Sequence, residues 1–266
     1  MTIGLLGCGK MGSALTLGAI KAGVFADDQV LAYDPVPAAI ESLGGGISSA
    51  GSLDEVIRKS DILLLCVKPG DVETVLTKIP SNNDSSDDLL IISIAAGVTL
   101  ATMERSAQHK ARIVRAMPNT PALVGEGAAA FSLGTDATSS DAAFAKKLLG
   151  SIGIVYQVKE PLLDSVTGIS GSGPAYVYTF IEALADGAVL EGLPRDQALA
   201  LATQTVLGAA KMVAYSKEHP ALLRDRVTSP GGTTIAGLVA LEEGAFRATT
   251  IKAVRTATAR ARELGA

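Results

Sequence analysis

The chain is poor in the residue types that most often carry enzyme chemistry. Its 266 residues include no Trp, five Phe, five Tyr, two His and two Cys. Two cysteines, Cys8 and Cys66, are too few for a disulfide framework or a four-ligand zinc site. Two histidines leave little room for a His-based metal cluster or a Ser-His-Asp triad. We therefore expect no metal site, and the source of any acid or base chemistry is an open question.

The charge and the hydrophobic runs argue against two further classes. The net charge of -4 gives no basic surface for nucleic acid or for an anionic membrane. The longest apolar runs, 62–67 and 89–98, are far too short to span a bilayer, and no basic residue precedes the apolar N-terminal segment as in a signal peptide. Free cysteines without an export signal favour a reducing compartment. We predict a cytoplasmic protein that binds neither nucleic acid nor membrane.

Short β-type runs alternate with helical patterns over about the first 130 residues. This order predicts an α/β fold, a Rossmann-type doubly wound sheet with right-handed crossovers over residues 1–160. Ser52 with Glu55 three residues later predicts a capping box. The polar segment 81–88 predicts a surface loop. The expected strands are 2–6, 29–34, 62–67, 89–94, 112–117 and 128–132, and the expected helices are 13–22, 35–43 and 52–59.

After Pro161 the strand-type runs end and long Ala-rich helical patterns follow. They predict an all-helical C-terminal domain over residues 161–266. So few aromatic side chains would bury little apolar area in a free unit of this size, so we predict at least a dimer. The expected helices are 174–191, 194–215, 220–227, 233–243 and 245–264.

A glycine-rich loop, GCGKMG, follows the first expected strand and opens a helix. In a dinucleotide-binding loop, Gly7 permits the tight turn, Gly9 lets the backbone approach a pyrophosphate, and Gly12 allows close packing of helix on strand. The phosphates would bind at the positive start of the helix. The alternative is that these glycines only shape the turn.

Further candidates for cofactor binding lie at the ends of later strands. Asp34 follows about 20 residues after the glycines and could accept bonds from the ribose hydroxyls, which favours NADH over NADPH. No Lys or Arg occurs in 33–43 to pair with a 2′-phosphate. The alternative role of Asp34 is to cap the next helix. Strand ends near the cofactor also include the VKPGD segment from Val67 and the AAGVT segment from Ala95.

Three longer segments carry a resemblance that covers essentially the whole chain. They are RAMPNTPALVGEG (115–127), the segment from GSGPAY to EGLP (171–194), and the segment from LLRDR to LEEG (222–244), which contains SPGGTT. With GCGKMG and VKP they closely resemble the pyrroline-5-carboxylate reductase family. The resemblance implies a cofactor, NADPH or NADH, and a C-terminal domain that exchanges helices with a second copy. Family members that prefer NADPH carry a neutral or basic residue at the position of Asp34.

The resemblance also assigns residues. It implies cofactor contacts at Gly7, Gly9, Lys10, Met11, Gly12, Asp34, Lys68, Pro69, Ala95 and Ala96. It implies a substrate loop of Ser229, Pro230, Gly231, Gly232, Thr233 and Thr234, with Thr234 as the catalytic residue beside the ring nitrogen of the pyrroline. Asn119 lies in a shared segment, and no role is assigned to it.

The chemistry of these residue types agrees with the implied reaction. SPGGTT precedes a helix, so its backbone N–H groups suit a carboxylate, and its hydroxyls can orient a ring nitrogen. The reaction is hydride transfer to the C=N bond of 1-pyrroline-5-carboxylate, which gives proline and completes its biosynthesis. A protonated imine is already electrophilic, so positioning matters more than a strong acid. The alternative for SPGGTT is a Ser/Thr helix cap without a ligand.

Other functions remain open at this point. The chain could reduce a related cyclic imine, or bind a dinucleotide without catalysis as a regulator. A β-hydroxyacid dehydrogenase would need a Lys on 175–191, where there is none. Cys8 and Cys66 fit the role of small hydrophobic residues better than that of nucleophiles. Glu182 and Asp186 share a helix face that could contact the site, the solvent or another subunit.

Overall fold

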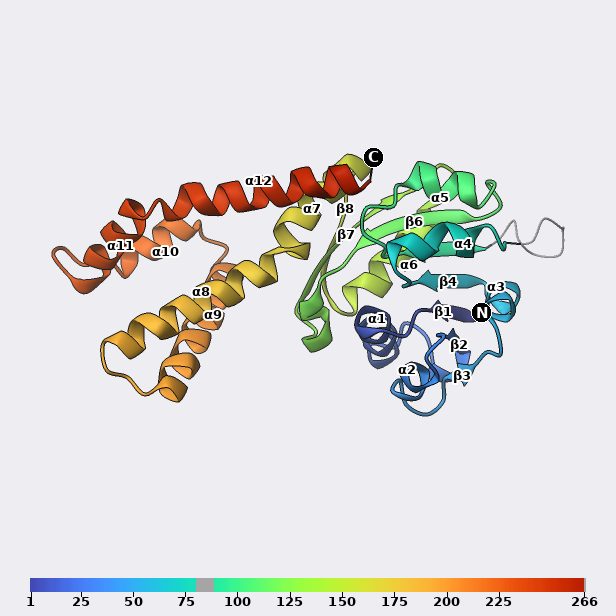
Figure 1. The fold of residues 1–266 in the computed structure, drawn as a ribbon, viewed down its shortest axis with the longest axis horizontal. Helices are drawn as coiled ribbons and strands as arrows, with labels where there is room; N and C mark the ends of the chain where they lie inside the picture. The colour runs from blue at the N-terminus through green and yellow to red at the C-terminus, as the bar shows by residue number, and fades with distance from the viewer. Residues whose placement is uncertain (80–88, 266) are drawn as a thin grey trace. The chain divides into compact units, whose positions relative to one another are not determined.

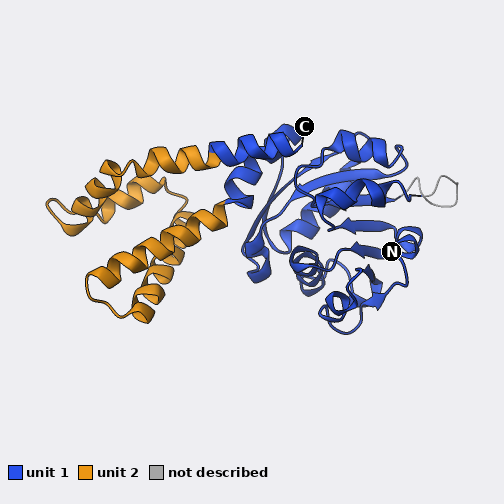
Figure 2. Cartoon of the chain, viewed as in Figure 1, with its two compact units in different colours: residues 1–172, 255–266 blue, residues 173–254 orange. Residues whose placement is uncertain are grey.

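The computed structural model describes residues 1–79 and 89–265, so the predicted loop 81–88 lies outside the described residues. The chain forms two compact units (Figure 2). Unit 1 comprises Met1–Ser172 and Arg255–Ala266, and unit 2 comprises Gly173–Val254. These units are defined by contacts, and the domain limits of 160 and 161 stay a prediction.

Unit 1 is built around an eight-stranded sheet with the order β3-β2-β1-β4-β5-β6-β7-β8 (Figure 1). All neighbouring strands run parallel except β6 and β7, which are antiparallel. The predicted strands are confirmed, and two edge strands that were not predicted, the two-residue β3 and the five-residue β8, complete the sheet. The strands are β1 Ile3–Leu6, β2 Val30–Tyr33, β3 Ser48–Ser49, β4 Ile62–Leu65, β5 Leu90–Ser93, β6 Arg112–Met117, β7 Gly127–Leu133 and β8 Gly153–Gln157.

Helices cover both faces of this sheet, which explains why its central strands are apolar throughout. One face packs on α1 (Lys10–Lys21) and α6 (Ser139–Gly150). The other face packs on α3 (Leu53–Lys59), α4 (Val72–Leu76) and α5 (Leu100–Ser106). The short elements are α2 Pro37–Glu41, α7 Leu163–Val166, the 3-10 turns η1 Asp27–Gln29, η2 Pro69–Asp71, η4 Thr120–Val124 and η5 Glu160–Leu162, and the π-helical turn η6 Thr167–Gly171.

The predicted cap of α3 forms only in part. Ser52 is the N-cap, and its hydroxyl accepts the Glu55 N–H at 3.2 Å. In a capping box the Glu55 carboxylate would accept the N–H of the N-cap itself. It accepts the Gly51 N–H instead, at 2.8 Å, and also pairs with Lys59. The reciprocal bond has therefore moved one residue towards the N-terminus.

Unit 2 consists of helices, as predicted. Gly192, with φ +97°, ends the turn between the packed pair α8 and α9. The buried apolar cluster in the described residues of this unit consists of three alanines, Ala185, Ala198 and Ala202. The helices are α8 Gly173–Leu190, α9 Arg195–Ser216, α10 Pro220–Arg226, α11 Thr233–Glu243 and α12 Phe246–Leu264, whose residues from Arg255 onward belong to unit 1.

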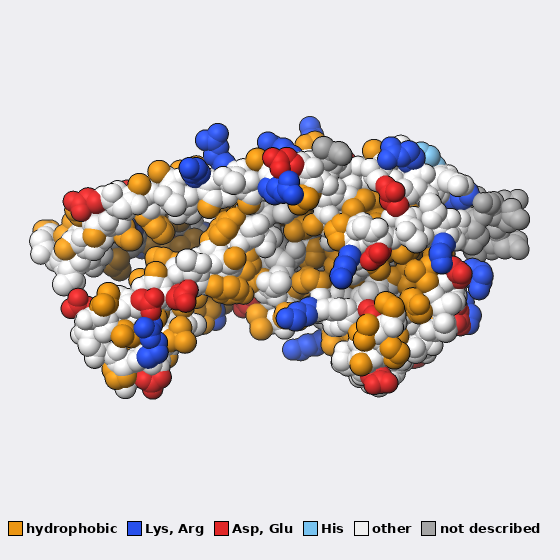
Figure 3. Space-filling view, viewed as in Figure 1, with side chains coloured by type: hydrophobic (Ala, Val, Ile, Leu, Met, Phe, Trp, Pro, Cys, Tyr) orange, Lys and Arg blue, Asp and Glu red, His pale blue; other side chains and the backbone are white. Residues whose placement is uncertain are grey.

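Large apolar side chains lie on the surface of these helices, and Figure 3 shows hydrophobic side chains gathered along them. None of the residues of α11 is buried, although most of them are apolar. By length and composition alone, one described helix, α9, could cross a membrane, with a mean hydropathy of 1.2. The exposed apolar residues of unit 2 include Tyr178, Leu190, Leu199, Leu201, Met212, Tyr215, Leu222, Val239 and Ile251.

Candidate active site

The carboxyl ends of four neighbouring parallel strands lie in one row. Leu6 of β1 pairs with Tyr33 of β2 and with Leu65 of β4, and Leu65 pairs with Ser93 of β5. The sequence continues from β1 to β2 on one side, and β4 adjoins β1 on the other, so a ligand site is expected at this edge. The segments that leave these four strands carry all the predicted cofactor residues: Gly7, Gly9, Lys10, Met11, Gly12, Asp34, Lys68, Pro69, Ala95 and Ala96.

Two glycines of the first segment are required by the fold itself. Gly7 has φ +93°, and a Cβ there would lie 2.5 Å from the carbonyl oxygen of Cys66. A Cβ on Gly12 would lie 2.1 Å from the carbonyl oxygen of Gly7. Backbone atoms cannot give way at such distances, so these glycines allow the loop to pass β4 and α1 to pack on the loop. For Gly7 and Gly12, the alternative that the glycines only shape the turn is therefore sufficient.

Gly9 is different, because its backbone does not need a glycine. It is the N-cap of α1 with φ -69° and ψ -177°, and no heavy atom lies within 4 Å of a Cβ built there. The cap makes no side-chain hydrogen bond, and the first turn of α1 has no acidic residue. The first N–H groups of a helix carry partial positive charge. The loop thus presents an open, electropositive cradle that fits a pyrophosphate.

Side chains hold this cradle in shape. The Ser13 hydroxyl donates to the Cys8 carbonyl oxygen at 2.9 Å. Asp34 is half-buried, and its carboxylate accepts the Cys8 N–H at 2.8 Å and the Val36 N–H at 2.9 Å. Asp34 therefore ties the glycine loop to the end of β2 and also shapes the turn before α2. Each oxygen retains a free lone pair, so contact with a ribose stays a prediction.

The other two strand ends present small or extended side chains. Lys68 and Pro69 are exposed at the start of η2, where the Asp71 N–H donates to the Lys68 carbonyl oxygen at 3.0 Å. Ala95 is buried, and its N–H donates to the Ser93 hydroxyl at 3.3 Å. Ala96 is exposed. Both alanines leave room for a ligand beside the end of β5.

The predicted substrate loop belongs to unit 2, whereas the glycine loop belongs to unit 1. Its chain turns at Gly231, with φ +66°, and the Gly232 N–H donates to the Ser229 carbonyl oxygen at 3.1 Å. A Cβ on Gly232 would lie 2.3 Å from the Ser229 hydroxyl oxygen. The left-handed conformation at Gly231 favours glycine, whereas Gly232 has φ -80° and a Cβ there would displace the Ser229 hydroxyl.

The start of α11 lacks the cap that the alternative interpretation requires. Gly232 is the N-cap, no side chain caps the helix, and its first turn has no acidic residue. Within residues 1–79 and 89–265, the hydroxyls of Ser229, Thr233 and Thr234 make no hydrogen bond, and Thr234 is half-buried. The interpretation as a Ser/Thr helix cap is therefore wrong, and both the hydroxyls and the helix start remain available to an anion.

The cysteine thiols near the glycine loop are unsuited to act as nucleophiles. Burial, with the charge of Asp34 as a second cause, raises the pKa of Cys8 to about 12. Burial, with Cys8 as a second cause, raises the pKa of Cys66 to about 12. Both thiols are thus protonated at neutral pH, and a thiolate is the reactive form. This supports their interpretation as small hydrophobic residues. Across the described residues, no group of three or more His, Cys, Asp or Glu could hold a metal ion.

Three residues without an assigned role now have a structural position. Asn119 is buried; its side chain accepts the Ala128 N–H at 2.8 Å and donates to the Ser170 carbonyl oxygen at 3.0 Å. It therefore joins η4, β7 and η6. Asp186 forms an ion pair with Arg195 that links α8 to the start of α9, and Glu182 is exposed.

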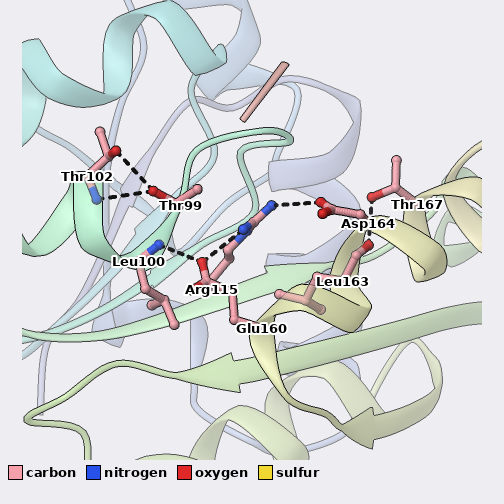
Figure 4. A network of polar contacts seen from close by, with 8 residues as sticks. All are labelled: Thr99, Leu100, Thr102, Arg115, Glu160, Leu163, Asp164 and Thr167. Carbon is pink, nitrogen blue, oxygen red and sulfur yellow. Dashed lines mark hydrogen bonds and ion pairs between the residues drawn. The ribbon is translucent and has the colours of Figure 1, made fainter. Parts of the chain in front are cut away.

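A buried arginine near the end of β5 was not among the predicted site residues. Arg115 of β6 is paired with Glu160 and Asp164, and Glu160 also binds the start of α5 (Figure 4). Arg115 opens one of the segments that carry the family resemblance, and an arginine inside an apolar strand is a signal in itself. Its partners are 45 and 49 residues away in sequence, and no local pattern identifies them.

Comparisons with known proteins agree along the whole chain. The family described as "Pyrroline-5-carboxylate reductase dimerisation" matches residues 160–264, and the family described as "NADP oxidoreductase coenzyme F420-dependent" matches residues 2–97. The pyrroline-5-carboxylate reductase of Pisum sativum is 47% identical over 99% of this chain and 96% of its own length. That of Escherichia coli (strain K12) is 45% identical over 95% of this chain and 94% of its own length.

Solved structures give the same result. The crystal structure of the Plasmodium falciparum pyrroline carboxylate reductase with NADP bound matches with a TM-score of 0.89 at 34% identity, and covers 100% of this chain and 98% of that chain. An imine reductase from Pseudomonas sp. matches with a TM-score of 0.55 at 20% identity, which shows a shared fold alone. At these identities and coverages, the chain belongs to the pyrroline-5-carboxylate reductase family, nicotinamide-dependent oxidoreductases that act on an imine bond.

Proposed function

We propose that this protein reduces the C=N bond of 1-pyrroline-5-carboxylate with NADPH or NADH and produces L-proline. The observation that carries the proposal is the row of four strand ends around an uncapped helix start, in a chain 47% identical to a pyrroline-5-carboxylate reductase. When bound, the reduced nicotinamide supplies the hydride. The assay is the oxidation of NADPH or NADH with pyrroline-5-carboxylate, beside other cyclic imines and with proline measured as product.

The dinucleotide would bind to the segments that leave the four strand ends. The loop from Gly7 to Gly12 would hold the pyrophosphate on the first N–H groups of α1, with Lys10 and Met11 at its rim. Lys68 and Pro69 would line the next strand end, and Ala95 and Ala96 would leave room for the nicotinamide ribose. The measurement that tests this set is the dissociation constant of NADPH and NADH for single variants of these residues.

For the choice of cofactor, we propose a preference for NADH. The Asp34 carboxylate lies at the end of β2 and retains lone pairs for two ribose hydroxyls. A 2′-phosphate at this position would bring a second negative charge against the carboxylate, and like charges repel. The ratio of kcat/KM for NADH and for NADPH measures this preference.

The SPGGTT segment would bind the carboxylate of the substrate. Gly231 and Gly232 remove side chains from the approach, and the start of α11 presents unbonded N–H groups. Ser229 and Thr233 would add hydroxyl donors. The hydroxyl of Thr234 would orient the ring nitrogen, and it needs no charge for that role. The SPGGTT segment contains no titrating side chain, so the substrate would arrive as the protonated imine.

Unit 2 would be completed by a second copy of the chain. A buried cluster of three alanines leaves most large apolar side chains of α8 to α11 in solvent, and such a surface marks an interface. A cavity of about 560 Å³ between α8 and the α11–α12 turn adds an apolar recess, lined by Tyr176, Phe180, Leu184, Leu241 and Phe246 among others. Light scattering during size-exclusion chromatography should give a dimer or a multiple of dimers, and an active monomer would refute this.

Association with a second copy would cover the exposed apolar side chains of α9. We therefore also propose that this protein is soluble and lies in the cytoplasm. Two unpaired thiols that stay protonated are compatible with a reducing compartment. Fractionation of cells after expression tests this. Activity in the soluble fraction is the expected result, and activity that sediments with membranes would contradict it.

A further inference from the structure

A polar network lies beneath the turn that follows β5. Arg115 is 7% exposed, and its Nη1 lies 2.9 Å from Oε1 of Glu160. Its Nη2 lies 3.7 Å from Oδ1 of Asp164 (Figure 4). Both acids stand on residues 160–166, the segment through which the chain leaves the sheet for unit 2. A buried guanidinium needs such partners, because an unpaired charge in the interior is strongly destabilising.

One oxygen of this network also reaches the cofactor edge. Oε1 of Glu160 accepts the Leu100 N–H at 2.7 Å, and Leu100 is the first residue of α5. Thr99, the N-cap, accepts the Thr102 N–H at 3.2 Å, so the start of α5 is held at two N–H groups. A carboxylate beside a helix start is favourable for the helix dipole. The turn 95–99, which carries Ala95 and Ala96, is thereby anchored at its far end.

The end of the chain packs against the same turn. Gly97 has φ +78°, and a Cβ there would lie 3.2 Å from the carbonyl oxygen of Leu264. A Cβ on Gly265 would lie 2.9 Å from the carbonyl oxygen of Gly97. The segment that leads to unit 2 and the segment that returns from it thus both hold the turn 95–99, the former through the Glu160 side chain and the latter through close backbone packing.

We propose that Glu160 is a positioning residue for the nicotinamide cofactor. It fixes the start of α5 through the Leu100 N–H, and so sets the position of the backbone at Ala95 and Ala96. Glu160 itself touches no reacting atom. This proposal rests on the proposed function only in that the strand ends form the cofactor site. What is new is that cofactor affinity also depends on the Glu160 side chain, which lies outside the segments that follow these strands.

Two substitutions separate positioning from charge pairing. Glu160→Ala removes the acceptor of the Leu100 N–H and a partner of Arg115. Glu160→Gln removes the charge but keeps an amide oxygen that can accept the same N–H. Asp141→Ala is the matched control, because it breaks the 2.9 Å ion pair of Asp141 with Arg112, the first residue of the same strand. The dissociation constants of NADPH and NADH are measured by titration calorimetry without substrate, with Tm, KM and kcat beside them.

We expect Glu160→Ala to weaken cofactor binding by about tenfold, because the start of α5 loses one hydrogen bond to a charged group. The KM for the cofactor should rise in proportion. Glu160→Gln should restore most of that affinity, while the KM for the imine changes less than about twofold. The control should lower Tm without changing cofactor binding. Equal dissociation constants in Glu160→Ala and the parent protein, or a loss that Gln does not restore, would overturn the inference. A parent protein that binds cofactor but does not reduce the imine would refute the proposed function alone.

Discussion

The sharpest prediction concerns Gly9→Ala, which separates the fold of the glycine loop from its function. The backbone at Gly9, with φ -69° and ψ -177°, accepts an alanine without strain, and the added Cβ meets no atom within 4 Å. Replacing Gly by Ala at a compatible position restricts the unfolded chain and stabilises the protein by about 0.4–1 kcal/mol. Alanine is less favourable than glycine at an N-cap by a similar amount. The two effects oppose each other, so the Tm of Gly9→Ala should stay close to that of the parent protein.

Cofactor binding by the same variant should be much weaker. The Cβ would occupy the space through which a pyrophosphate approaches the first N–H groups of α1. Losing about two charge-assisted hydrogen bonds at their lower value of about 1.5 kcal/mol each amounts to about 3 kcal/mol, or roughly a hundredfold in the dissociation constant. Titration calorimetry with NADH and NADPH measures this change, and differential scanning calorimetry measures the Tm.

Two further glycines serve as controls. Gly12→Ala places a Cβ 2.1 Å from the Gly7 carbonyl oxygen, so it should destabilise the fold by about 1–3 kcal/mol as well as abolish binding. Gly45→Ala lies in the loop between α2 and β3, where a Cβ meets no atom, and should change neither quantity much. Cofactor binding by Gly9→Ala as tight as that of the parent protein would refute the assignment of this loop to the pyrophosphate.

Three predictions concern other parts of the site. Thr234→Ala should lower kcat at least about tenfold with cofactor affinity unchanged, and Thr234→Ser should recover most of the rate; unchanged turnover would remove the hydroxyl from the reaction. Asp34→Ser should shift the kcat/KM ratio towards NADPH and weaken both cofactors, because the Cys8 N–H loses its acceptor; a constant ratio would contradict the assigned role. Native Cys8 and Cys66 should resist iodoacetamide at pH about 8, because their pKa values are raised to about 12. Rapid labelling of the folded protein would refute these raised pKa values. Since the folded state favours the protonated thiols, the free energy of unfolding should fall as pH rises above 9.0, the ordinary pKa of a cysteine.

Local patterns predicted the elements that dominate the fold. The run at Ile62–Leu65 is apolar throughout because helices cover both faces of the sheet, and it is a central strand as expected. Helix α11 begins and ends at the predicted residues, Thr233 and Glu243. The four strand ends with their candidate cofactor residues were also predictable, because the carboxyl ends of parallel strands meet at one edge.

The parts that escaped prediction depend on contacts between distant residues or lie at the edges of the sheet. Strand β3 is two exposed serines without an apolar pattern. Strand β8 is an edge strand with no buried residue, and its run of Ile, Val and Tyr was a strand signal that the prediction left unused. Asp34 was expected either to bind ribose or to cap a helix, but its bond to the Cys8 N–H spans 26 residues and was visible only in the structure. The bond from Leu100 to Glu160 spans 60 residues, and no periodicity encodes it.

Reduction of 1-pyrroline-5-carboxylate is the activity on which the roles of all these residues depend. To measure it, the purified protein is incubated with that imine and with NADH or NADPH, and cofactor oxidation and proline formation are followed in the same reaction. One proline should form for each cofactor oxidised, with faster turnover than for other cyclic imines. Binding of the cofactor with no proline formed from either NADH or NADPH would contradict it.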